Sequence, residues 1–224
     1  MPSFQIFVFD AYGTLFDVHS AVARHREAIG PQAERLSELW RAKQLEYTWT
    51  RALMGRYRDF AALTGEALEF AASRCGGIAP STRAALIDAY NTLDAYADVK
   101  PALSALKARG AQTAILSNGT PAMLASAVRS AGLEHLLDAV LSVDPLRLYK
   151  TAPAAYGLVG ARFGAAPEAV SFQSSNRWDV AGAAAFGFSC VWINRSGAPD
   201  EYGDLPPARA LASLEGLEPA AGAT

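Results

Sequence analysis

The sequence predicts an α/β fold with a Rossmann-like three-layer core, a mostly parallel sheet and an inserted helical cap subdomain. Two observations support this fold class. Five short runs rich in β-branched and aromatic residues alternate with single helical segments, and the long segment after the first run contains no convincing strand. Strands that alternate with helices form right-handed crossovers, which make the strands parallel and cover both faces of the sheet.

The predicted elements follow from short apolar runs, for strands, and from longer segments with helical periodicity. The strands are expected at 4–9, 113–117, 139–143, 170–174 and 188–193, and the helices between them near 101–109, 121–131, 152–163 and 179–186. Residues 18–96 are dense in Ala, Leu, Arg and Glu and predict roughly four helices. We therefore expect a core domain of residues 1–17 and 97–224 and a helical cap domain of residues 18–96. In the Gly-, Pro- and Ala-rich tail, one short helix is expected at 208–214.

Length and composition exclude several classes of protein. The 224 residues suffice for one core with a smaller insertion, and 51% hydrophobic residues argue against disorder. The net charge of −2 gives no general attraction to nucleic acid or membranes. Two cysteines, Cys75 and Cys190, form no metal-binding spacing, and the N-terminal apolar run lacks the basic flank of a signal peptide. We expect a cytoplasmic protein without nucleic-acid or membrane partners.

Polar side chains follow four of the predicted strands, where ligands bind in open parallel sheets. They are Asp10, Tyr12, Thr14, Ser117, Asn118, Asp144, Lys150, Ser174, Ser175, Asn176 and Asp179. No histidine lies at these positions, so a serine or cysteine nucleophile would have no histidine base there. The sequence also lacks the GxGxxG, GxxxxGK[ST], HExxH and GxSxG motifs. What remains is a carboxylate nucleophile beside a lysine.

The segment Phe9-Asp-Ala-Tyr-Gly-Thr-Leu-Phe16 resembles the first motif of the haloacid dehalogenase superfamily. The Ala-Tyr pair after Asp10 is similar to its L-2-haloacid dehalogenase (type II) branch. Segments 40–47, 116–119 and 174–179 resemble motifs of the same branch in the same order. The resemblance extends from residue 4 to about residue 195, which is nearly the whole predicted fold.

This resemblance implies hydrolysis of short-chain L-2-haloalkanoic acids to D-2-hydroxy acids, through a covalent aspartyl ester and with inversion at C2. It implies no cofactor and no metal, and a 2-haloacid and a halide ion as ligands. The implied catalytic residues are Asp10, Thr14, Arg41, Ser117, Asn118, Lys150, Tyr156, Ser174, Asn176 and Asp179. The implied substrate-binding residues are Ala11, Tyr12, Arg41, Leu45, Phe60, Ser117, Asn118 and Trp178. The resemblance is compatible with a homodimer, although the residues themselves leave the oligomeric state open.

Two alternatives stay open at this point: a magnesium-dependent phosphatase of the same superfamily and a non-catalytic member. Tyr12 stands where a phosphatase typically has its second carboxylate, and Asn176 stands near its metal-binding acid. The residues also suggest that Lys150 and Arg41 together offset the charges of Asp10 and Asp179. Three departures from the family pattern, Thr151, Gln173 and Arg177, leave the rigidity and the substrate range of the site open.

Overall fold

The computed structural model describes residues 4–217, so the two ends of the predicted core domain, 1–3 and 218–224, lie outside the described residues. It contains one six-stranded sheet in the order β3-β2-β1-β4-β5-β6, in which every pair of neighbouring strands is parallel. The strands are β1 (Ile6–Phe9), β2 (Gln112–Ser117), β3 (Ala139–Ser142), β4 (Val170–Ser174), β5 (Ser189–Ile193) and β6 (Arg209–Leu211). The predicted α/β fold with a mostly parallel sheet is confirmed.

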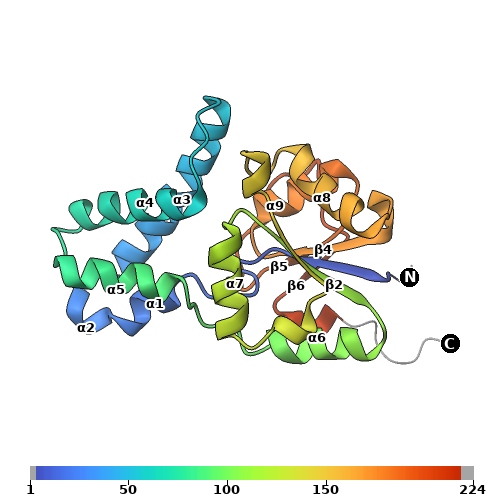
Figure 1. Cartoon of the computed structure of the whole chain (residues 1–224), viewed down its shortest axis with the longest axis horizontal. Helices are drawn as coiled ribbons and strands as arrows, with labels where there is room; N and C mark the ends of the chain where they lie inside the picture. The colour runs from blue at the N-terminus through green and yellow to red at the C-terminus, as the bar shows by residue number, and fades with distance from the viewer. Residues whose placement is uncertain (1–3, 218–224) are drawn as a thin grey trace.

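Helices cover the sheet on both faces, with α6 and α7 on one face and α8 and α9 on the other (Figure 1). Their bounds are α6 (Val99–Ala108), α7 (Pro121–Ser130), α8 (Pro153–Phe163) and α9 (Arg177–Phe186). Helix α7 begins where the Thr120 side chain accepts a hydrogen bond from the backbone N–H of Met123. Helix α8 ends at Gly164, whose φ of +66° favours glycine.

The segment between β1 and α6 is helical, as expected, and Figure 1 shows its helices grouped beside the sheet. They are α1 (Ser20–Arg24), α2 (Arg26–Ile29), α3 (Ala33–Leu53), α4 (Phe60–Arg74) and α5 (Pro80–Tyr90). Helices α3 and α4 pack against each other, and Asp59 caps α4 by accepting a hydrogen bond from the backbone N–H of Ala62. The long α3 extends away from this group, and it carries Arg41.

The prediction of a short helix at 208–214 is wrong. Residues 209–211 form the edge strand β6, parallel to β5, and a 3₁₀ turn follows at Leu214–Leu217. A strand of three residues with intermediate or exposed side chains has no apolar alternation to mark it, because pairing with the main chain of β5 holds it in place. The five other strands and the four helices between them begin and end within two residues of the predicted bounds.

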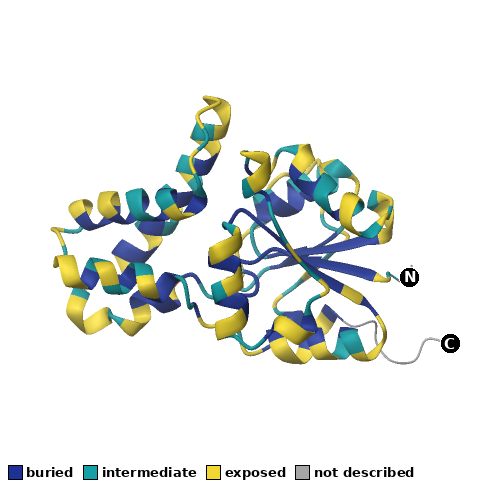
Figure 2. Ribbon diagram, in the orientation of Figure 1, coloured by how far each residue is buried: buried dark blue, intermediate teal, exposed yellow. Residues whose placement is uncertain are grey.

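The strand register brings the predicted site residues to one edge of the sheet. Phe9 at the end of β1 pairs with Ile115 in β2 and with Gln173 in β4. Asp10 and the ends of β2 and β4 therefore meet at the carboxyl edge, where the strand order reverses between β1 and β4. Strands β1, β2 and β4, which end at this edge, are buried except for Gln112 (Figure 2), so a well-packed core supports the site.

Candidate active site

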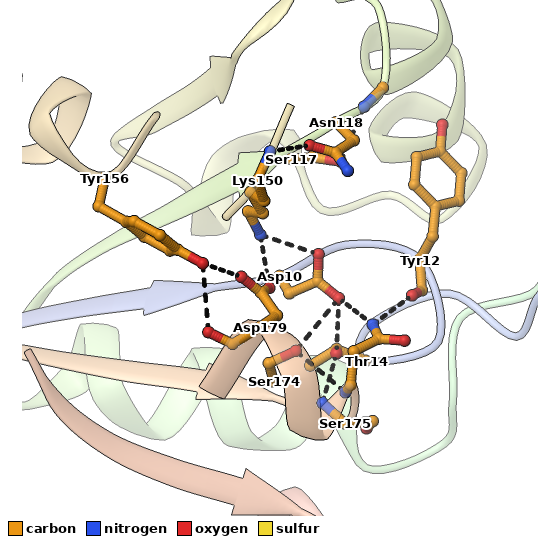
Figure 3. Close-up of polar contacts among 12 residues, drawn as sticks. Asp10, Tyr12, Thr14, Ser117, Asn118, Lys150, Tyr156, Ser174, Ser175 and Asp179 are labelled. Atoms are coloured by element: carbon orange, nitrogen blue, oxygen red, sulfur yellow. Dashed lines mark hydrogen bonds and ion pairs between the residues drawn. The ribbon is translucent and has the colours of Figure 1, made fainter. Parts of the chain in front are cut away.

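Three charged side chains form the centre of the site, and Lys150 lies between the two carboxylates (Figure 3). The Lys150 ammonium nitrogen donates to Asp10 Oδ1 at 3.1 Å and to Asp179 Oδ2 at 2.7 Å. All three residues are buried, with exposed fractions of 5% for Asp10, 1% for Lys150 and 0% for Asp179. The sequence placed them after three different strands, and the fold brings both acids into contact with Lys150.

The second oxygen of Asp10 accepts hydrogen bonds from three side chains. Thr14 Oγ1 donates at 3.0 Å, Ser174 Oγ at 3.4 Å and Asn176 Nδ2 at 2.7 Å. The backbone N–H of Ser175 donates to Thr14 Oγ1 at 2.8 Å, so the threonine hydroxyl is itself held in place. These donors fix the plane of the Asp10 carboxylate, which is what an in-line attack by one of its oxygens requires.

Asp179 lies in the first turn of α9 and is fully buried. Burial raises the pKa of its carboxyl group to about 6, against the opposing effect of Lys150. The Tyr156 hydroxyl donates to Asp179 Oδ1 at 2.8 Å, and it also lies 3.3 Å from the Asp179 carbonyl oxygen. A carboxylate with a pKa near neutrality is suited to exchange a proton with water at physiological pH.

Lys150 itself is held by the end of β2. Its backbone N–H donates to Asn118 Oδ1 at 2.9 Å, which leaves the Asn118 amide nitrogen free to donate elsewhere. Ser117 is fully buried, and its Oγ accepts a hydrogen bond from the backbone N–H of Gly119 at 3.1 Å. Burial lowers the pKa of the Lys150 ammonium, but the carboxylates of Asp10 and Asp179 more than offset this, and its pKa is raised. Lys150 therefore stays positively charged.

Arg41 reaches the same edge from α3. Its Nη2 donates to the backbone carbonyl of Tyr12 at 3.1 Å and to Asn176 Oδ1 at 3.3 Å, and its Nη1 donates to Gln44 Oε1 at 2.9 Å. These three acceptors are neutral groups. The expectation that Arg41 and Lys150 share the charges of Asp10 and Asp179 therefore needs correction, since Lys150 alone contacts both carboxylates. The positive charge of Arg41 remains available for an anion.

Four of the predicted substrate-binding residues have large apolar side chains, and the structure brings them only partly together. Tyr12 packs against Phe60, with ring centroids 5.5 Å apart, and Phe60 is 1% exposed. Trp178 packs edge-on against Trp49 of α3, also at 5.5 Å, and Leu45 is half-buried on α3. Tyr12 and Phe60 thus form one aromatic contact, while Trp178 forms another with the outer part of α3.

Tyr12 closes one end of the site. Its hydroxyl oxygen is buried without a hydrogen-bond partner in the described part of the chain, and burial raises the pKa of this phenol. Its ring stacks on Tyr90, with centroids 5.7 Å apart. A Cβ on Gly119 would lie 2.8 Å from Tyr12 Cε2, so the ring depends on glycine at that position. Ala11, before it, is fully buried in the turn after β1.

Two residues that position Arg41 are absent from the sequence-based prediction. Gln44 is fully buried and accepts from the Tyr90 hydroxyl at 3.0 Å as well as from Arg41, while its own amide donates to Thr64 at 2.6 Å. The spacing of three residues between Arg41 and Gln44, on one helix face, is the signal that could have found Gln44. Tyr90 lies far away in the sequence and carries no such signal.

The structure also places Gln173 and Arg177, two of the three departures from the family pattern. The Gln173 amide donates to Ser171 Oγ within its own strand at 2.6 Å. Arg177 pairs with Asp200 at 2.6 Å and donates to the carbonyls of Tyr202 and Leu205. Both side chains are therefore engaged away from the Asp10 carboxylate, and Arg177 ties the C-terminal segment to α9.

The donor set does not fit a divalent cation. A hard cation requires several oxygen ligands, and the Lys150 ammonium lies between the two carboxylates that would supply them. Across residues 4–217, no three His, Cys, Asp or Glu side chains gather closely enough to hold a metal ion. Within the same residues, no helix is long and apolar enough to cross a membrane.

Comparison with known proteins agrees with this geometry. The family of haloacid dehalogenase-like hydrolases matches residues 4–187. The (S)-2-haloacid dehalogenase 1 of Pseudomonas sp. (strain CBS-3) is 49% identical over 218 residues, which cover 97% of this chain and 96% of that protein. A crystal structure of a dehalogenase superposes with a TM-score of 0.94 at 46% identity, covering 97% of this chain and 96% of the other.

A further solved structure is the L-2-haloacid dehalogenase of Xanthobacter autotrophicus with chloropropionic acid covalently bound. It superposes with a TM-score of 0.86 at 39% identity, covering 96% of this chain and 97% of the other. The sequence motifs, the parallel fold and these similarities all agree. The chain therefore belongs to the haloacid dehalogenase superfamily of hydrolases, in its L-2-haloacid dehalogenase branch.

Proposed function

We propose that this protein hydrolyses short-chain L-2-haloalkanoic acids to D-2-hydroxy acids through a covalent ester on Asp10. The observation that carries the proposal is the Asp10 carboxylate, fixed by three neutral donors and by Lys150, with Tyr12 where a second acid would stand. A halide leaves without needing a proton, so the absence of that acid is compatible with carbon–halogen cleavage. The relatives named as (S)-2-haloacid dehalogenases support the same substrate class.

In the first step, an oxygen of the Asp10 carboxylate attacks C2 of the substrate. The new O–C2 bond forms as the carbon–halogen bond breaks, and the halide leaves with the bonding electrons. Attack from the side opposite the halogen inverts C2, so an L-2-halo acid gives a D-2-hydroxy acid. The structure of a relative with chloropropionic acid covalently bound supports a covalent intermediate here.

Donors around the site have the charge that this step requires. Among residues 4–217, Arg41 donates only to neutral acceptors and the Asn118 amide nitrogen has no acceptor, so both can stabilise the departing halide as its charge develops. Ser117, Lys150 and the backbone amides of Ala11 and Tyr12 hold the substrate carboxylate in this proposal. Tyr12, Phe60, Leu45 and Trp178 surround its alkyl group in this proposal.

In the second step, water attacks the ester carbonyl carbon of Asp10. Asp179 accepts one proton from this water, the O–C(carbonyl) bond to the substrate oxygen breaks, and the leaving alkoxide takes the second water proton from the newly formed Asp10 carboxyl group. The D-2-hydroxy acid departs, the Asp10 carboxylate is restored, and Asp179 releases its proton to solvent. Tyr156 and Lys150 each donate to a different oxygen of Asp179, which orients this base. Residues 18–96 act as a cap in this proposal, since α3 supplies Arg41 from outside the sheet.

The test is halide release from L- and D-2-chloropropionate in the presence of a chelator, with the wild type and Asp10→Asn. We expect release from the L isomer alone, no effect of the chelator, and loss of activity by about 10⁴-fold or more in the variant. Release that requires magnesium, or turnover of p-nitrophenyl phosphate with added magnesium, would instead support the phosphatase alternative.

A single turnover in ¹⁸O-labelled water tests the ester. Because water attacks the carbonyl carbon of Asp10, the label should enter the Asp10 carboxylate, and the first product molecule should be unlabelled. Mass spectrometry of the peptide that contains Asp10 and of the hydroxy acid distinguishes this from direct attack of water on C2. Label in the first product would contradict the covalent route.

A further inference from the structure

Gly182 lies inside α9, three residues after Asp179, and two side chains from the loop and helix that follow Lys150 approach it closely. A Cβ placed on Gly182 would lie 2.5 Å from the Tyr156 hydroxyl oxygen and 2.6 Å from Thr151 Cγ2. Contacts of a Cβ below 3.0 Å are essentially never seen in proteins, so an alanine here would force a neighbour to move. Glycine inside a helix is disfavoured relative to alanine, so the chain bears a cost at this position.

Tyr156 has little room to move. Its side chain is fully buried, and its ring contacts Phe172, Phe186 and Phe188 at centroid distances of 6.0, 5.8 and 5.9 Å. Thr151, in contrast, is exposed and lines a cavity of about 580 Å³. A side chain at position 182 would also lie 2.7 Å from Thr151 Cβ, so the contact at Thr151 is relieved only by a shift of its main chain, and the contact at Tyr156 only by moving the hydroxyl.

We propose that Gly182 is a positioning residue whose missing side chain lets the Tyr156 hydroxyl reach Asp179. The inference deepens the proposed function, on which it rests for the role of Asp179 in the reaction. Its geometric basis is the 2.8 Å hydrogen bond from Tyr156 to Asp179 Oδ1 beside the space that a Cβ on Gly182 would occupy. A larger residue displaces the hydroxyl and leaves the Asp179 carboxylate with one donor fewer.

The displacement has a consequence that a purely structural role would not have. Lys150, Asp10 and the Cys190 thiol face Asp179 together with Tyr156. The hydrogen bond from Tyr156 lowers the pKa of Asp179, so its loss raises that pKa while the other three groups stay in place. The variant Gly182→Ala should therefore shift the acid limb of the pH–rate profile upward.

The experiment compares Gly182→Ala with Gly65→Ala as a matched control. Gly65 is also inside a helix, α4, but a Cβ there meets nothing within 4 Å. We expect Gly182→Ala to lower kcat by about 10- to 100-fold with little change in KM. We expect Gly65→Ala to keep its activity and to raise Tm by about 2 to 4 °C.

A double-mutant cycle with Tyr156→Phe identifies the atom involved. Phenylalanine lacks the oxygen that a Cβ on Gly182 would contact, and glycine at position 151 removes the second contact. In a Thr151→Gly background, the kcat loss in Tyr156→Phe/Gly182→Ala should therefore nearly equal that in Tyr156→Phe alone. Additive losses would overturn the inference. If the single and the double variant that carry Gly182→Ala both fail to fold while Tyr156→Phe and Gly65→Ala fold, Gly182 serves folding and the inference is also overturned.

A second readout separates this inference from the proposed function. Carboxylate ¹³C NMR of labelled aspartate measures the pKa of Asp179 directly, without substrate. We expect Gly182→Ala and Tyr156→Phe to raise this pKa by the same amount. If the pKa rises but the wild type releases no halide, the positioning role stands and the proposed function fails. If the wild type is active and Gly182→Ala matches Gly65→Ala in kcat and pKa, the inference fails.

Discussion

The sheet side and the helical side of the site hold their charged groups in different ways. On the sheet side, Asp10, Lys150 and Asp179 are buried and bound to one another, and further side-chain donors fix both carboxylates. On the helical side, Arg41 is half-buried and donates to neutral oxygens. The reacting groups are thus fixed by the core, whereas the group proposed to meet the halide comes from a helix outside it.

Because of this difference, substitutions on the two sides should affect stability and turnover to different extents. A charge in the buried cluster is coupled to its neighbours, so its removal affects both folding and turnover. Arg41 has no buried charge partner among its contacts, so its removal should affect turnover much more than folding. Substitutions on the two sides can therefore test the contrast directly.

The largest effect is expected for Lys150→Met. It leaves two buried carboxylates without their shared cation, which should lower the free energy of unfolding by about 3 to 5 kcal/mol at pH 8 and abolish turnover. Without Lys150 the pKa of Asp179 rises further, so the neutral acid forms more readily and the loss should be smaller at pH 5. Urea unfolding at the two pH values measures this.

The matched control is Lys107→Met, because Lys107 pairs with Asp138 at 2.8 Å on the surface. That pair should contribute at most about 1 kcal/mol. A Lys150 variant no less stable than the Lys107 variant would contradict the coupling of charges in the cluster.

Arg41→Met should give the next largest effect. Removal of one preorganised donor that meets developing charge should lower kcat by about 10²-fold, while the free energy of unfolding changes by about 1 kcal/mol or less. Lys43→Met, on the same helix and paired with Glu46, serves as the control. Steady-state halide release and urea unfolding of both variants measure this, and a large loss of stability in Arg41→Met would remove the contrast between the two sides.

The pH dependence should be smaller and graded. Asp179 must be ionised to accept a proton from water, and burial raises its pKa to about 6. Ester hydrolysis should therefore fall about tenfold per pH unit below the pKa that Asp179 has in the ester, which is lower than in the resting enzyme because esterified Asp10 carries no charge. Rapid-quench measurement of the ester across the acid range in which the enzyme stays folded tests this, and a rate without any acid limb would contradict the role of Asp179 as the base.

The smallest effect on turnover is expected for Arg177→Gln. Its hydrogen bonds run to Asp200 and to carbonyls of the C-terminal segment, so kcat and KM should stay unchanged. The free energy of unfolding should fall by about 1 to 3 kcal/mol, because a buried charged donor is lost. A change in KM for 2-chloropropionate would instead connect Arg177 to the substrate.

Most of the fold was predictable because its signals are local. Buried parallel strands are short apolar runs, and their carboxyl ends carry the polar residues, so the sequence alone assigns Asp10, Ser117 and Ser174 to one edge. Strand β6 could not be predicted in this way, since three residues at a sheet edge owe their conformation to pairing with β5. The same limit applies to the extent of α3 and α4, which depends on packing between these two helices.

Within the site, residue identities were predictable and partnerships were not. The motifs identified Asp10, Lys150 and Asp179. Opposite charges alone did not reveal that Lys150 forms ion pairs with both acids while Arg41 forms one with neither. That outcome depends on how α3 crosses the sheet edge, which places Arg41 against the carbonyl of Tyr12. The role of Gly182 could not be predicted from the sequence, because it depends on atoms of α8 and of the loop before that helix that approach Gly182 in the folded chain.

Because Asp10 and Asp179 contact the same ammonium group, the ionisation of Asp179 depends on whether Asp10 is charged. In the resting enzyme, the negative charge of Asp10 raises the pKa of Asp179. Once Asp10 is esterified in the proposed reaction, that charge disappears. Of the two carboxylates that Lys150 contacts in the resting enzyme, only Asp179 then remains charged. The pKa of Asp179 then falls, so this group becomes fully ionised at the stage when water must lose a proton. Formation of the Asp10 ester would thus itself ionise Asp179, the base that promotes hydrolysis of this ester.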